Sequence, residues 1–178
     1  WHLGAAPEFH PLKRGFSEQF GFTGGGHDYF KANPAGETRE YLVPIERDGQ
    51  PVVETEYLTD ALSREAAAFV RRHAARPFFL YLAYNAPHTP LQALRSDYDA
   101  LGHIGNHTLR TYGAMIRALD RGVGRVLEAL EANGLADDTL VIFSSDNGGA
   151  NYIGLSDINA PYRGWKMTFF EGGVRSPF

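Results

Sequence analysis

The residues best suited to chemistry follow a short apolar run in the last third of the chain. Residues 139–143 (TLVIF) are rich in β-branched side chains and lead directly into the polar sequence SSDNGG at 144–149. The carboxylate of Asp146 and the amide oxygen of Asn147 are hard donors of the type that calcium and magnesium bind. Asp, Asn and Gly also dominate ordinary turns, and this segment taken alone favours a turn. Metal binding is therefore a hypothesis that depends on the polar residues nearby.

Three other side chains could take part in acid–base or electrostatic chemistry. His88 lies between two prolines in NAPHTP at 85–90, and a fixed imidazole can donate a hydrogen bond or transfer a proton. Lys166 lies in RGWKMTFFEGG at 163–173, where an ammonium group can bind a sulfate or phosphate oxygen. His2 is a weaker candidate from spacing alone. Each has an ordinary alternative as a surface side chain, since the chain has seven histidines and lysine is rarely buried.

The elements that position these groups are predicted from the apolar pattern. Residues 78–84 (FFLYLAY) and 139–143 are continuous apolar runs, which are typical of strands buried on both faces. Between them, residues 112–130 keep a helical period. Strand, helix and strand form a βαβ unit, so the two strands are expected to be parallel. Because chemistry in such sheets lies at the carboxyl ends of the strands, His88 and the Asp-Asn pair are expected at one edge.

Two further elements are predicted upstream. Apolar residues recur at helical spacing between residues 62 and 74, and Thr59 or Asp60 could cap that helix. Within the polar stretch 31–56, Asp48-Gly49 separates two short apolar groups, a pattern that predicts a small hairpin.

Composition narrows the function classes. The 178 residues include no cysteine, which excludes disulfides, thiolate metal sites and a cysteine nucleophile within them. A net charge of -4 gives no basic footprint, so we expect no nucleic-acid partner. The longest apolar run is far shorter than the roughly 20 residues of a membrane span. The sequence also lacks the nucleophile elbow, the phosphate-binding loop and the dinucleotide fingerprint.

Seven motifs, in this order, resemble the type I, formylglycine-dependent sulfatase family. The likeness is greatest to the arylsulfatases and N-acetylgalactosamine-6-sulfatases. Each motif alone is modest, whereas the ordered set is specific. The motifs are WHLG at 1–4, GGGHDYF at 24–30, YLTD at 57–60, PFFLYLAYNAPHTPLQ at 77–92, YGAMIRALDRGVGRVL at 112–127, TLVIFSSDNGG at 139–149 and RGWKMTFFEGGVRSPF at 163–178.

The resemblance implies a fold and an activity. The fold would be α/β, an alkaline-phosphatase-like sandwich with a mostly parallel central sheet flanked by helices. Residues 1–178 would be part of a single catalytic domain. The activity would be hydrolysis of sulfate esters of carbohydrates or aryl alcohols, with a calcium ion as cofactor. The resemblance also suggests a periplasmic, secreted or lysosomal location.

The resemblance assigns roles to five residues. Asp146 and Asn147 match two of the family's calcium ligands. His88 matches the histidine near the leaving-group oxygen, and Lys166 matches the lysine that contacts the sulfate. His2 matches the histidine of the GKWHLG motif in the active site.

Other family features have no counterpart in these residues. The Cys/Ser-x-Pro-x-Arg segment that yields the formylglycine, and two early aspartates, lie upstream of the position of Trp1 in the family. We therefore expect this chain to be a fragment of the catalytic domain that is inactive alone. Two alternatives stay open: a phosphatase or phosphodiesterase of the same superfamily, and a non-catalytic relative that binds sulfated glycans.

Overall fold

The structure is a computed structural model that describes residues 1–31 and 41–178. Part of the predicted polar stretch at 31–56 therefore lies outside the described residues. The helices are α1 (Leu58–His73), α2 (Arg95–Ala100), α3 (His107–Ala132) and α4 (Glu171–Val174). The strands are β1 (Phe20–Gly21), β2 (Ile45–Arg47) and β3 (Gln50–Val52). Short 3-10 helices span Pro7–Phe9, Pro11–Lys13, Ala136–Asp138 and Asn151–Ile153.

The predicted long helix is confirmed as α3, which has capping residues at both ends. The Asn106 side chain accepts a hydrogen bond from the backbone N–H of Leu109 at 2.9 Å, which satisfies one of the free donors of the first turn. At the other end Asn133 is the C-cap, and Gly134 follows with a φ of 68°. A left-handed glycine after the C-cap is a common helix stop.

The predicted upstream helix is confirmed as α1, but the predicted cap is wrong. The N-cap is Tyr57, with no side-chain capping bond, and both Thr59 and Asp60 lie inside the first turn. There the Asp60 carboxylate faces the positive end of the helix dipole and pairs with Arg121 of α3 at 3.2 Å. The chain can begin the helix early because Tyr57 and Leu58 are buried and supply a packing anchor in place of a cap.

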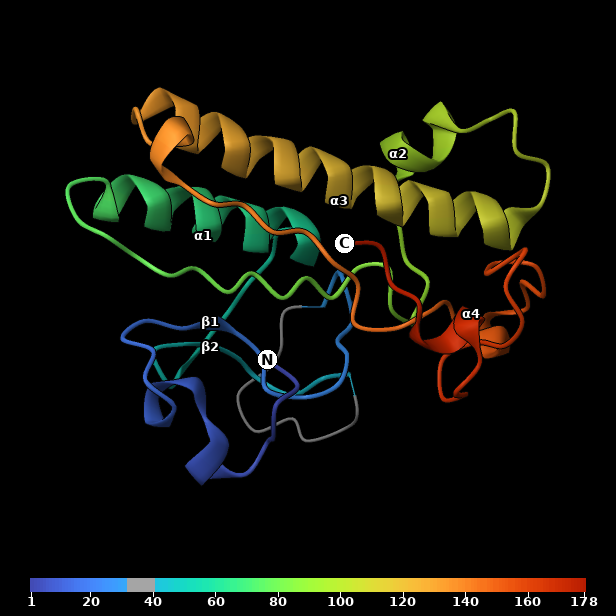
Figure 1. Ribbon diagram of the computed structural model, residues 1–178, viewed down its shortest axis with the longest axis horizontal. Coiled ribbons are helices and arrows are strands. Elements are labelled where there is room, and N and C mark those ends of the chain that lie inside the picture. The colour runs from blue at the N-terminus through green and yellow to red at the C-terminus, as the bar shows by residue number, and fades with distance from the viewer. Residues whose placement is uncertain (32–40) are drawn as a thin grey trace.

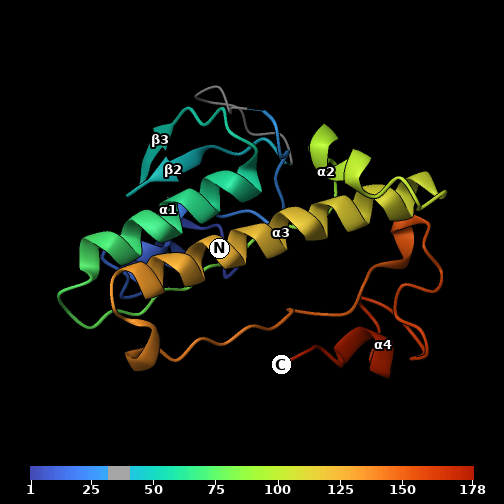
Figure 2. The ribbon, with the colours of Figure 1, turned by 90° about the horizontal axis from the view of Figure 1, so that it is seen from above.

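Helices α1 and α3 lie side by side and form one layer of the molecule (Figures 1 and 2). Small residues line the contact, including Ala61, Ala114 and Ala118, which are completely buried. A β-carbon on Gly122 of α3 would overlap the Ser63 hydroxyl of α1. The helix axes therefore approach closely, and this layer provides most of the buried core. No helix in residues 1–31 or 41–178 combines the length and the apolar character that crossing a membrane requires.

The predicted hairpin is confirmed with shifted bounds. Strands β2 and β3 are antiparallel, with Ile45 opposite Val52, and β1 pairs with β2 to complete a small sheet. The turn residues Asp48 and Gly49 have φ values of 52° and 77°. Positive φ at both positions is the geometry of the tight turn that Asp-Gly favours.

The two apolar runs, which we call the first run (78–84) and the second run (139–143), are extended but pair with no strand in the part of the chain that the structure describes. The predicted parallel sheet is therefore not observed. Burial on both faces is wrong for the second run, where Leu140 is 86% and Ile142 is 64% exposed. A parallel strand becomes buried only when neighbouring strands and helices cover it, and the described residues supply the second run with too little of either.

The first run is covered on one face only, so burial on both faces is wrong here too: Phe79 is 75% and Tyr81 is 47% exposed. Phe78 packs against the core between α1 and α3. On the opposite face, Phe79 lies 6.0 Å from Phe16, and Tyr81 lies 6.0 Å from Trp1, between ring centroids. The run ends at the loop that carries His88.

Candidate active site

His88 and Lys166, which are 78 residues apart in the sequence, meet in the folded chain. Nζ of Lys166 lies 3.1 Å from Nε2 of His88. His88 follows the first run, and Lys166 lies in the loop region after the second run (Figure 1). This contact joins the loop of His88 to the region after the second run, while the predicted meeting of His88 with Asp146 and Asn147 stays a prediction.

The contacts of the His88 ring define its protonation state. Nδ1 lies 2.9 Å from the carbonyl oxygen of Thr89. A carbonyl oxygen can only accept a hydrogen bond, so Nδ1 carries the proton. Nε2 then presents its lone pair to the Lys166 ammonium group, which can only donate. In this arrangement Nε2, rather than Nδ1, is the ring nitrogen that faces the lysine.

Buried polar contacts fix the backbone of the His88 loop. The hydroxyl of Tyr29 donates to the carbonyl of His88 at 2.9 Å, and the N–H of His88 donates to the carbonyl of Asn85. The buried Asn85 side chain in turn donates to the carbonyl of His27. Because both Tyr29 and Asn85 are buried, these contacts hold the loop of His88 against the core.

Lys166 is positioned by the turn that follows the second run. Its backbone N–H donates to the carbonyl of Gly149 at 3.1 Å. Asn159 connects the same two loops. Its side-chain oxygen accepts from the N–H of Gly149 at 2.7 Å, and its side-chain nitrogen donates to the carbonyls of Gly149 and Gly164 at 2.9 and 3.1 Å.

Asn159 is a residue that the sequence analysis missed. An asparagine in a loop is common, and nothing in its sequence neighbourhood indicates contacts with residues ten positions away. Only the fold shows that one side chain holds together the turn after the second run and the loop of Lys166.

Asp146 and Asn147 lie at the end of the second run, as predicted. Asp146 is exposed, Asn147 is half-buried, and the Asn147 side-chain nitrogen donates to the carbonyl of Gly148. This leaves the carboxylate of Asp146 and the amide oxygen of Asn147 as donors, the chemistry that suits a hard cation. Within residues 1–31 and 41–178, no three His, Cys, Asp or Glu side chains gather as a metal site. Calcium takes roughly six to eight oxygen ligands, so these two residues alone would supply only part of such a shell.

His2 lies on the other side of the glycine turn that borders His88. A β-carbon built on Gly25 would lie 2.9 Å from Nε2 of His2, and one built on Gly26 would lie 3.1 Å from Nδ1 of His88. Consecutive glycines thus contact the two histidines. All three candidate residues, His2, His88 and Lys166, are in one neighbourhood.

The sequence of the whole chain, residues 1–178, matches the Sulfatase family. The chain belongs to the sulfatase family. The resemblance found from the ordered motifs is therefore confirmed, and the geometry around His88 and Lys166 belongs to a sulfatase fold.

Individual relatives agree with the family assignment. N-acetylgalactosamine-6-sulfatase of Mus musculus is 36% identical, over 99% of this chain and 35% of the relative. Arylsulfatase J of Mus musculus is 35% identical, over 99% of this chain and 30% of the relative. The solved structure of Ps i-CgsB in complex with k-i-k-neocarrahexaose is 47% identical with a TM-score of 0.91, covering 99% of this chain and 42% of that one. The chain thus spans about a third of the length of its curated relatives.

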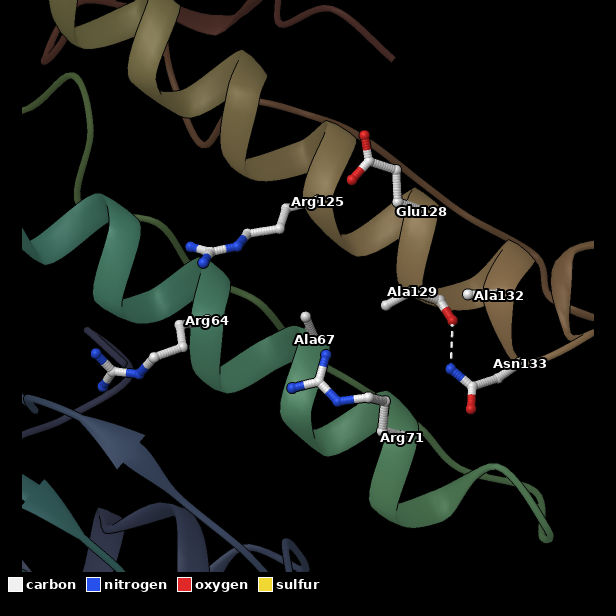
Figure 3. Close-up of a pocket in the computed structure, with 8 residues that line it drawn as sticks. All are labelled: Arg64, Ala67, Arg71, Arg125, Glu128, Ala129, Ala132 and Asn133. Carbon is white, nitrogen blue, oxygen red and sulfur yellow. Dashed lines mark hydrogen bonds between the residues drawn. The ribbon is translucent and has the colours of Figure 1, made fainter.

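A hollow elsewhere on this sulfatase chain is not the catalytic site. It lies between α1 and α3, has a volume of about 260 Å³ and is lined by Arg64, Ala67, Arg71, Arg125, Glu128, Ala129, Ala132 and Asn133 (Figure 3). Arg64 is neutralised there by Glu54, Glu56 and Glu65. None of the candidate site residues lines this hollow, so it is separate from the candidate site.

Proposed function

We propose that the protein containing this chain is a sulfuric ester hydrolase that acts on sulfated carbohydrates or aryl sulfates. The observation that carries the proposal is the contact between Nζ of Lys166 and Nε2 of His88 at 3.1 Å. It places the ammonium group of Lys166 beside a ring nitrogen of His88. An ammonium group can bind an oxygen of a sulfate ester, and an imidazole can assist the departing alcohol. Membership of the sulfatase family supports the choice of sulfate as the anion.

Lys166 and His88 would have complementary roles. When a sulfate ester enters, the Lys166 ammonium would bind a sulfate oxygen and stabilise the charge that develops on it. Nε2 of His88, freed from the lysine, would take up the proton that the attacking hydroxyl group loses and then donate it to the oxygen of the departing alcohol. His2, on the other side of the glycine turn, would complete the polar wall of the site.

Asp146 and Asn147 would contribute to a calcium site. Their oxygen atoms fit the preference of calcium, and further ligands would come from outside these 178 residues. A bound calcium ion would supply Lewis-acid stabilisation of the sulfate oxygens. The nucleophile, which the resemblance implies is a formylglycine, would also lie outside residues 1–178. We propose that residues 1–178 are part of a single catalytic domain.

The exposed apolar runs support a larger sheet in the complete protein. The second run exposes Leu140 and Ile142, and the first run has open edges. We propose that further strands flank these runs and form the mostly parallel central sheet of the alkaline-phosphatase-like fold. Apolar side chains that are exposed here would then be buried, which the hydrophobic effect favours.

A sulfated oligosaccharide is the first substrate to test. The solved relative Ps i-CgsB, at 47% identity, was crystallised with k-i-k-neocarrahexaose. The full-length protein is expected to release sulfate from neocarrahexaose or from 4-nitrophenyl sulfate, as measured by ion chromatography. Lys166→Ala and His88→Ala are each expected to lower kcat/KM by roughly a hundredfold or more.

The same assay separates the alternatives. Release of phosphate from 4-nitrophenyl phosphate, with no sulfate release from any sulfate ester, would identify a phosphatase. Calorimetric binding of neocarrahexaose without turnover would identify a non-catalytic relative. Either outcome would overturn the proposed activity.

The metal site has its own test. Asp146→Ala in the full-length protein is expected to weaken calcium binding, as measured by calorimetry. An unchanged affinity would exclude this residue as a ligand.

A further inference from the structure

The turn formed by Gly24, Gly25 and Gly26 lies against the side chains of the candidate site. A β-carbon on Gly25 would approach three atoms of the His2 ring, the nearest at 2.9 Å. A β-carbon on Gly26 would overlap the ring of Tyr41 and approach Nδ1 of His88 at 3.1 Å. Real β-carbons almost never come within 3.0 Å of another heavy atom. Each glycine therefore leaves space that a specific ring occupies.

Backbone conformation does not require these glycines. Neither Gly25 nor Gly26 has a positive φ, whereas Gly21, a few residues earlier, has a φ of 135°. The case for glycine at these two positions therefore rests on the space beside them. Gly24 provides the contrast, because a β-carbon there would make only an ordinary contact of 3.5 Å with Val43.

The other side of the turn is held by a buried histidine. His27 is 1% exposed, and its two ring nitrogens lie 2.6 Å from the carbonyl of Asp28 and 2.8 Å from the carbonyl of Val43. The N–H of Asp28 also donates to the carbonyl of Tyr41 at 2.8 Å. The turn cannot move away from the rings without breaking these contacts.

Backbone strain gathers at the same place. Among residues 1–31 and 41–178, four non-glycine residues have positive φ: His2 at 52°, Tyr41 at 65°, Met167 at 76° and Asp48 in the hairpin turn. Three of these lie at the candidate site: His2 is a candidate site residue, the Tyr41 ring covers Gly26, and Met167 directly follows Lys166. A left-handed conformation is costly for such side chains and is typically retained at functional sites.

We propose that Gly25 and Gly26 are positioning residues that set the rings of His2 and His88 for the reaction. Gly25 leaves room for the His2 ring. Gly26 leaves room for the Tyr41 ring, whose centroid is 6.3 Å from that of His88, and for the His88 ring itself. This inference rests on the proposed sulfatase function, and it adds two residues with no reactive group to the active site.

The kinetic test uses three alanine variants of the full-length protein. Gly25→Ala and Gly26→Ala are each expected to lower kcat for 4-nitrophenyl sulfate by roughly tenfold to a hundredfold, because small displacements of catalytic groups are costly. KM is expected to change by less than about threefold. Gly24→Ala, the matched control in the same turn, is expected to stay within about twofold of the wild type. Wild-type kcat in both test variants would overturn the proposal.

A second measurement reports the accessibility of the two histidine rings without requiring turnover. Diethyl pyrocarbonate modifies accessible imidazoles, and peptide mass spectrometry gives a rate for each histidine. Gly25→Ala is expected to change the rate at His2 and Gly26→Ala the rate at His88, with His103 unchanged as an internal reference. Unchanged rates at His2 and His88 would overturn the proposal even if kcat falls. Because this readout needs no catalysis, it still tests the geometry if the wild-type protein hydrolyses no sulfate ester.

A double-mutant cycle covers the case in which a variant folds poorly. If the β-carbon of Gly25→Ala collides with His2, the substitution destabilises the wild-type protein but not the His2→Ala variant, in which the ring is absent. Thermal unfolding of the four proteins provides the comparison. An equal loss of stability in both backgrounds would show that the β-carbon meets something other than the His2 ring, and would overturn the assignment of Gly25.

Discussion

The two apolar runs have the same sequence character but different surroundings. Both are continuous, β-prone segments that lead into a loop carrying candidate site residues. The first run lies between the helix layer and the aromatic rings of Trp1 and Phe16. In the second run most side chains are exposed, and Leu140 is 86% exposed. The comparison shows that an apolar pattern indicates where burial is favourable, while the covering elements determine whether it occurs.

The largest effect is expected within the first run, where adjacent phenylalanines face opposite sides. Phe78→Ala removes a ring that packs on the core and on Phe69 at 5.5 Å. We expect it to lower the free energy of unfolding by about 2–4 kcal/mol. Phe79→Ala is the matched control, because Phe79 is 75% exposed, and it should cost about 1 kcal/mol. Urea unfolding of the full-length protein measures both, and equal costs would contradict the two-faced packing.

An intermediate effect is expected in the second run. In the 178-residue chain, Ile142→Ala should change the free energy of unfolding by less than about 0.5 kcal/mol, since Ile142 is 64% exposed. In the full-length protein, the proposed central sheet would bury this side chain, and the cost should rise to about 1–3 kcal/mol. Urea unfolding of both proteins makes the comparison. A small cost in both would contradict the proposed sheet.

The smallest effect concerns the end of α1, which leads into the first run. Glu18 accepts from Arg72 at 2.7 Å and contacts His73, and the Arg72 guanidinium, with a smaller contribution from His73, holds the pKa of Glu18 below its ordinary value of 4.5. A lowered carboxyl pKa gives stability that is present above the ordinary value and is lost as the pH falls through the folded-state pKa. Glu18→Gln should therefore destabilise the protein slightly at neutral pH and flatten the acid side of its stability profile. Chemical unfolding on both sides of pH 4.5 measures this, and parallel profiles would contradict it.

The helices and the hairpin could be predicted because their determinants are local. The apolar period of α3 and the Asn133-Gly134 stop at its end belong to one continuous segment. The Asp48-Gly49 turn likewise lies directly between the two strands that it joins. The cap of α1 could not be predicted, since burial of Tyr57 replaces side-chain capping. The pairing of the apolar runs depends on residues far away in sequence, which local patterns do not specify.

The sequence indicates candidate reactive residues of the site, but it does not indicate the residues that support them. His88, Lys166 and the Asp-Asn pair have side chains whose chemistry is visible in the sequence. Asn159 and Gly26 act through geometry, and their types are common in any loop. A glycine leaves room for a particular ring, and an asparagine reaches particular carbonyl groups, only when distant segments of the chain come together. Local sequence does not specify how these segments approach.

The three hydrogen bonds of Asn159 have a mechanical consequence. They join the turn after the second run to the loop of Lys166, so the two segments cannot shift independently. Under the proposed function, a shift of Lys166 towards a bound anion would therefore also act on Gly149, which both Asn159 and the backbone N–H of Lys166 contact. Anion binding and the position of the neighbouring Asn147 would then be coupled through the backbone of this turn.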